Sequence, residues 1–143
     1  MVGLIVTGHG HFATGLTSSI DLIAGPQENY VAVDFDGNGT DKLEADLKAA
    51  FETLKDCEGI LVFSDLAGGS PFRTAALVSA GIPNVKVLAG TNLPMLCEIA
   101  MGRTFINDVE MLVSSALATG KDGVQEFVMP TIDDGPADGE DGI

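Results

Sequence analysis

The chain has 143 residues, of which 45% are hydrophobic and 20% are charged, which is typical of one soluble globular domain. The formal net charge is -14, from 21 acidic against 7 basic residues. This charge argues against nucleic acid and anionic membranes as partners, because neither would be attracted to the protein.

Two cysteines are too few for a disulfide framework, and they form no CxxC pair of the kind that binds zinc. We expect neither a metal nor a cofactor. The sequence shows no signal-peptide pattern and no apolar run long enough to cross a membrane. We therefore expect a cytoplasmic protein without direct membrane insertion.

Strand and helix patterns alternate along the chain. Short apolar runs predict strands over residues 2–7, 30–35, 59–63 and 84–89. Helical spacing and start signals predict helices over residues 12–24 and 40–55, from 70, from 94, and over 107–119. This alternation predicts an α/β fold with an open, mostly parallel four-stranded sheet and helices on both faces.

The composition divides the chain into two parts. Residues 1–130 are predicted to form the folded domain. Residues 131–143 are rich in Asp, Gly and Pro, and we expect an acidic, disordered tail that keeps the protein soluble.

His9 is the first candidate for chemistry. It lies between Gly8 and Gly10, just after the first predicted strand. Open α/β sheets bind their ligands at the carboxyl ends of strands, and the two glycines leave the imidazole uncrowded. The sequence therefore predicts that His9 lies at a ligand site.

A second segment follows the third predicted strand. Asp65 could hold one ring nitrogen of His9 and leave the other nucleophilic. Gly68 and Gly69 let the backbone turn, and Ser70 offers a hydroxyl where a proline begins the next helix. Free N–H groups at that helix start would bind an anion, so we expect a site for a phosphoryl group.

Two other readings of these residues stay open. His9, Asp65 and Ser70 are the residue types of a hydrolase triad, although Ser70 lacks the G-x-S-x-G elbow and is better explained as a helix cap. A non-catalytic, flavodoxin-like module that binds an anion would use the same glycines and give His9 no covalent role. His11, at the entrance to the first helix, and Asn92, after the fourth strand, are secondary candidates.

The residue identities in three segments indicate a particular protein family more specifically than the alternation of strands and helices does. Residues 8–10, residues 65–72 and residues 90–96 together resemble the IIA component of the mannose/fructose/sorbose family of the bacterial phosphoenolpyruvate-dependent sugar phosphotransferase system. The resemblance covers about residues 1–130. Residues 27–29 and the helix start at 70–73 look closest to the branch that serves N-acetylgalactosamine.

The resemblance implies a mechanism and partners. His9 would accept a phosphoryl group from the phosphocarrier protein HPr and pass it to a IIB component. From there the group would reach sugar that enters through the membrane components IIC and IID. Asp65 would orient the histidine, and Ser70 with the amides around Gly69 would receive the phosphoryl oxygens.

The resemblance also implies a homodimer that exchanges a C-terminal strand, for which residues 124–129 are the plausible counterpart. His11 departs from the family, because relatives more often carry an apolar or small residue there. A second imidazole that could be phosphorylated therefore stays open.

Overall fold

The computed structural model describes residues 1–131. The strands are β1 (Gly3–His9), β2 (Tyr30–Phe35), β3 (Ile60–Ser64) and β4 (Val85–Leu88). The helices are α1 (Phe12–Ile23), α2 (Asp41–Thr53), α3 (Ser70–Val78), α4 (Leu93–Gly102) and α5 (Val109–Asp122). The sheet has the order β2-β1-β3-β4, and every pairing is parallel, which confirms the predicted α/β class.

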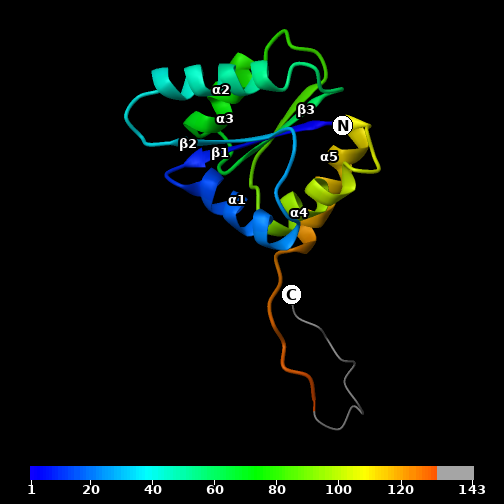
Figure 1. Cartoon of the computed structure of the whole chain (residues 1–143). Helices are drawn as coiled ribbons and strands as arrows, with labels where there is room; N and C mark the ends of the chain where they lie inside the picture. The colour runs from blue at the N-terminus through cyan, green and yellow to red at the C-terminus, as the bar shows by residue number, and fades with distance from the viewer. Residues whose placement is uncertain (132–143) are drawn as a thin grey trace.

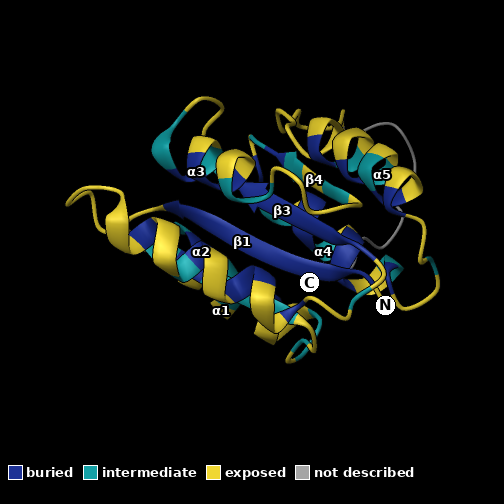
Figure 2. Cartoon of the chain, turned by 90° about the horizontal axis from the view of Figure 1, so that it is seen from above, coloured by how far each residue is buried: buried dark blue, intermediate teal, exposed yellow. Residues whose placement is uncertain are grey.

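Helices cover both faces of the sheet (Figure 1). One core cluster joins side chains of α1, α4 and α5 to one face, and a second joins α2 and α3 to the other. The inner strands β1 and β3 are buried almost throughout (Figure 2), as their continuous apolar sequences require.

The first strand extends further than the sequence predicted. β1 continues to His9 because it still pairs with β2 there, in register with Phe35. Its pairing with β3 ends two residues earlier, at Thr7 opposite Ser64. His9 is therefore the last residue of a strand that has lost one neighbour, and its side chain reaches the rim of the sheet.

Helix starts also differ from the prediction. Gly69 is the N-cap of α3 and Ser70 is its first residue, so the interpretation of Ser70 as a cap is wrong. Thr40 precedes α2 but makes no capping hydrogen bond through its side chain. α5 begins at Val109 rather than 107, because the Asp108 side chain caps it by accepting from the Met111 amide at 3.1 Å.

Residues 124–131 form no strand within this single chain and extend away from the domain after α5 (Figure 1). Val124, Phe127, Val128 and Met129 are exposed there. The exchange of this segment between subunits stays a prediction. The predicted disordered tail falls, from residue 132 on, outside the described residues. No helix in the described part of the chain is long and apolar enough to cross a membrane.

Candidate functional site

The strand order places the candidate site. From β1 the chain passes through α1 to β2 on one side, and from β2 it passes through α2 to β3 on the other side of β1. Ligands bind open α/β sheets where the order reverses in this way, outside the carboxyl ends of the strands. His9 ends β1 and Asp65 directly follows β3, so both residues lie at this point.

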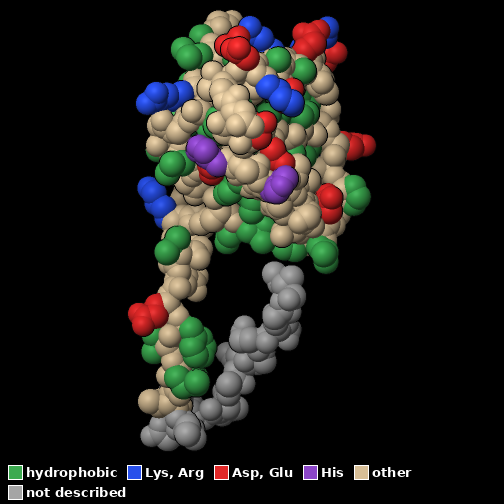
Figure 3. Space-filling model, turned by 90° about the vertical axis from the view of Figure 1, so that its left-hand side faces the viewer, with side chains coloured by type: hydrophobic (Ala, Val, Ile, Leu, Met, Phe, Trp, Pro, Cys, Tyr) green, Lys and Arg blue, Asp and Glu red, His purple; other side chains and the backbone are tan. Residues whose placement is uncertain are grey.

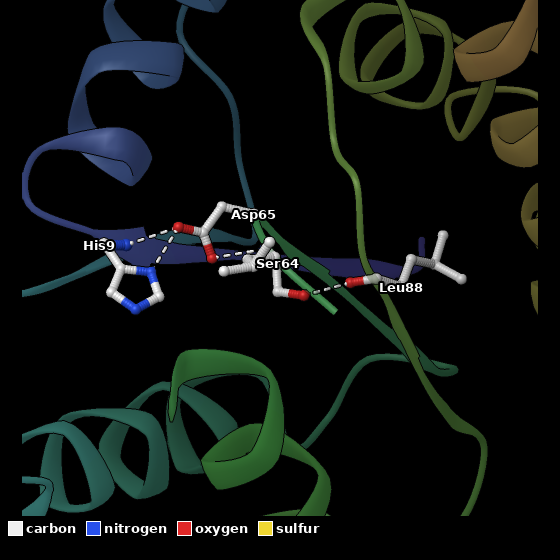
Figure 4. A network of polar contacts seen from close by, with 5 residues as sticks. His9, Ser64, Asp65 and Leu88 are labelled. Atoms are coloured by element: carbon white, nitrogen blue, oxygen red, sulfur yellow. Dashed lines mark hydrogen bonds and ion pairs between the residues drawn. The ribbon is translucent and has the colours of Figure 1, made fainter. Parts of the chain in front are cut away.

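The two residues form a close pair (Figure 4). Asp65 Oδ2 lies 2.7 Å from His9 Nδ1 and also accepts the His9 backbone N–H at 2.9 Å. An ionised Asp65 accepts from a protonated Nδ1, which leaves the lone pair on Nε2. The described residues provide no hydrogen-bond partner for Nε2. The imidazole is thus fixed by one nitrogen and open at the other.

The environment keeps Asp65 ionised. Burial alone would raise its pKa, since the side chain is only 15% exposed. The hydrogen bonds from His9 and from the Leu66 amide, which donates to Oδ1 at 2.7 Å, outweigh burial and hold the pKa below its ordinary value. Asp65 is therefore charged at neutral pH and is an acceptor for the ring.

Packing fixes the plane of the His9 ring while leaving it accessible. Phe35 of β2 meets the ring edge-to-face, with ring centroids 5.6 Å apart and planes at 67°. On another side lies Gly69, where a Cβ would stand 3.0 Å from His9 Cε1. The His9 side chain remains 46% exposed. Nearly half of the His9 side chain is therefore accessible to a partner molecule.

The start of α3 faces this ring with unpaired amides. Gly69 N–H is already used, because it donates to Leu66 O at 3.0 Å. The amides of Ser70 and Phe72 have no acceptor among the described residues, and Pro71 has no N–H. Gly68 has φ of +78°, the left-handed conformation that turns the chain into the helix. Of the residues predicted to bind the phosphoryl group, Gly69 thus has its amide occupied, whereas the Ser70 amide is open; the anion site itself stays a prediction.

His11 lies outside this pair. Its Nδ1 is 3.3 Å from Asp34 Oδ2, and the Asp34 carboxylate also accepts the Thr14 hydroxyl at 2.7 Å and the Thr14 amide at 3.0 Å. The His11 side chain is 94% exposed. Figure 3 shows both histidines of the chain on one face of the molecule.

Asn92 has a packing role. Its Oδ1 accepts the Met95 amide at 3.2 Å at the start of α4, and its Nδ2 donates to Gly120 O at 2.8 Å in α5. The structure shows no contact between Asn92 and His9. No group of three or more His, Cys, Asp or Glu residues within residues 1–131 could hold a metal ion.

Sequence reasoning missed Phe35, Leu66 and Asp34. Phe35 and Asp34 end β2, the neighbour of β1, so the pairing of these strands is the signal that could have found them. The contribution of Leu66 is a backbone amide, which the identity of a side chain does not reveal.

An exposed imidazole in contact with a half-buried carboxylate, at the reversal point of a parallel sheet, defines a doubly wound α/β protein with a candidate histidine site. The model of one protein family, described as the PTS system fructose IIA component, matches residues 3–117. The chain belongs to this family, EIIA-man, which confirms the resemblance to IIA components of the mannose type.

Sequence matches to relatives cover most of this chain. The mannose-specific EIIAB component of Escherichia coli (strain K12) is 32% identical over 125 residues, which are 87% of this chain and 39% of that protein. This chain thus spans about two-fifths of that relative. The fructose-specific EIIA component of Bacillus subtilis (strain 168) is 33% identical over 100 residues, covering 69% of this chain and 68% of the relative.

A solved structure has the same fold. The crystal structure of phosphotransferase system component EIIA from Streptococcus agalactiae matches with a TM-score of 0.78 and 34% identity. The match covers 88% of this chain and 97% of that chain.

Proposed function

We propose that this protein is a phosphoryl carrier of a sugar phosphotransferase system and that His9 is the residue that carries the phosphoryl group. The observation that supports this role is the 2.7 Å contact of His9 Nδ1 with Asp65, which leaves Nε2 exposed and unpaired. Relatives named as PTS IIA components support the phosphotransferase activity.

The proposed reaction is a direct transfer between histidines. His9 Nε2 attacks the phosphorus of a phosphohistidine on the donor, so that a new N–P bond forms as the donor N–P bond breaks. The donor imidazole leaves with the electron pair of that bond. His9 keeps its Nδ1 proton, and the Asp65 carboxylate stabilises the positive charge that develops on the ring.

The start of α3 supplies the anion site of the proposal. The free amides of Ser70 and Phe72 and the positive end of the helix dipole favour the phosphoryl oxygens. The Ser70 hydroxyl is a further donor. Gly69 lies against the ring and leaves room for a group on Nε2 beside it.

The proposed partners follow from membership of the family. The donor is the phosphocarrier protein HPr, and the acceptor is a IIB component, which passes the phosphoryl group to sugar that enters through the membrane components IIC and IID. The net charge of -14 suits short-lived docking with basic faces on these partners. The proposal includes a cytoplasmic homodimer and the N-acetylgalactosamine branch of the family.

Intact mass spectrometry tests the proposal. The wild-type protein, His9→Gln and His11→Gln are each incubated with phosphoenolpyruvate, enzyme I and HPr. We expect an acid-labile phosphoryl group at His9 in the wild-type protein and in His11→Gln. This group should form only when HPr is present. It should be absent from position 9 in His9→Gln.

A wild-type protein that stays unmodified while a known acceptor in the same reaction is phosphorylated would overturn the proposal. It would favour the non-catalytic anion-binding module. Phosphorylation that is stable to acid would point away from a histidine.

A further inference from the structure

The chain carries two carboxylate–imidazole pairs at the same end of the sheet. In the first pair, His9 of β1 contacts Asp65, which follows β3. In the second pair, His11 contacts Asp34 of β2. Because β2 and β3 flank β1, the two carboxylates approach from opposite sides of the strand that leads into both histidines.

The second carboxylate is also held by hydrogen bonds. Asp34 accepts two hydrogen bonds from Thr14, one from its amide at 3.0 Å and one from its hydroxyl at 2.7 Å. Burial would raise the pKa of Asp34, but these bonds and His11 together lower it. Asp34 is thus an ionised acceptor that Thr14 holds in place beneath His11 Nδ1.

The surroundings of His11 offer one basic side chain, Lys42, beside the carboxylates of Asp34 and Asp36. His11 borders an open hollow of about 380 Å³ that Lys42 also lines. The Lys42 ammonium group now lies 2.5 Å from Asp46 Oδ2 and is largely exposed, so it can turn toward the hollow at little cost. The imidazole is open to a partner on the face that also bears His9 (Figure 3).

We propose that His11 is a second phosphoryl acceptor, oriented by Asp34 and served directly by the same phosphohistidine donor as His9. This inference rests on the proposed function, because it takes the donor from it. His11 Nε2 forms the new N–P bond while the donor N–P bond breaks, and the donor imidazole leaves with the electron pair. The Nδ1 proton of His11 stays toward Asp34.

The geometry also predicts that His11 reacts more slowly than His9. The contact of His11 with its carboxylate is 3.3 Å rather than 2.7 Å, and the ring is 94% rather than 46% exposed. A looser ring spends less time in the reactive orientation, and an exposed phosphoryl group meets more water. We therefore expect slow labelling at His11 beside fast labelling at His9.

The test follows phosphoryl groups by intact mass over time. Wild type, His9→Gln and the double variant His9→Gln/His11→Gln are incubated with phosphoenolpyruvate, enzyme I and HPr. We expect one slowly gained, acid-labile group on His9→Gln and none on the double variant. Nitrogen-15 NMR of the modified His9→Gln protein should place the group on Nε2 of His11.

The outcomes separate the two proposals. Labelling of wild type without labelling of His9→Gln overturns the role of His11 and leaves that of His9 intact. No labelling of either protein overturns both. A group that persists on the double variant assigns the second modification to another residue and overturns the inference.

A matched pair of variants tests the orientation by Asp34. In the His9→Gln background, Asp34→Asn should slow labelling of His11 about tenfold or more, because an outer carboxylate that fixes an imidazole contributes on this scale. Asp36→Asn is the control, since Asp36 lines the same hollow but bonds the Asn38 amide instead. Equal rates in the two variants would contradict the inference, and circular dichroism checks that both are folded.

Discussion

Asp65 Oδ2 accepts two hydrogen bonds from one residue, His9, at 2.9 Å from its backbone amide and at 2.7 Å from its ring. The first bond joins the end of β1 to the segment after β3, where the ladder between these strands has already ended. The second sets the ring relative to that backbone. One carboxylate oxygen therefore both joins the end of β1 to the segment after β3 and orients the imidazole.

Replacement of this carboxylate should impair phosphoryl transfer. In Asp65→Asn the amide oxygen can still accept one bond, but it provides no charge to stabilise the phosphorylated ring. We expect the rate of transfer from phospho-HPr to His9 to fall about 10²- to 10⁴-fold. Rapid-quench measurement of the phosphorylated fraction gives this rate.

The control for this variant is Asp56→Asn, because Asp56 is exposed and precedes β3, whereas Asp65 follows that strand. It should retain the wild-type rate. If Asp65→Asn also transferred at the wild-type rate, the carboxylate would not orient the histidine for reaction.

Stability should depend on pH through the same contact. The pKa of Asp65 is lowered in the folded protein, against an ordinary value of 3.8. A lowered pKa means that the ionised carboxylate contributes stability above pH 3.8, and that this contribution disappears as the pH falls through the folded value. Urea unfolding should show Asp65→Asn less stable than wild type at pH 7, with the difference shrinking below about pH 3.8. A difference that grows in acid would contradict this sign.

The pattern of apolar runs was enough to predict the strands, the layers and the location of His9, because buried parallel strands have a distinctive composition. Asp65 was predicted because it follows such a strand. The end of β1 was not predicted correctly, since His9 belongs to the strand only through its pairing with Phe35.

Local sequence patterns could not predict contacts between segments that lie far apart in the chain. Asp34 approaches His11 because Thr14 holds it, and Arg103 is almost fully buried because it bonds a distant turn. Neither follows from periodicity. Ser70 also showed a limit of local signals, because the backbone placed the cap one residue earlier, at Gly69.

Arg103 is predicted to be the most sensitive basic residue for folding. It is 1% exposed and donates to Val2 O at 2.9 Å, to Asn29 O at 3.0 Å and to Gln27 Oε1 at 3.1 Å, and also bonds Glu28 O. Arg103→Met removes all of these bonds and takes this donor from Val2 O, which is buried. We expect a loss of about 3 kcal/mol or more in the free energy of unfolding.

Urea unfolding measures this loss, with Arg73→Met as the control. Arg73 is exposed in α3, and its removal should change the free energy of unfolding by less than about 0.5 kcal/mol. Similar losses in both variants would show that the bonds of Arg103 do not stabilise the fold.

The neighbouring glycines Gly68 and Gly69 should fail in different ways when replaced by alanine. At Gly69, φ is -73°, which alanine adopts freely, but the new Cβ would stand 3.0 Å from His9 Cε1. At Gly68 the space is open, but φ of +78° strains any side chain. Gly69→Ala should therefore slow phosphoryl transfer with little change in stability. Gly68→Ala should cost about 1–2 kcal/mol of stability. Rapid-quench rates and urea unfolding of both variants check this, and a normal rate in Gly69→Ala would show that the His9 ring moves aside without consequence.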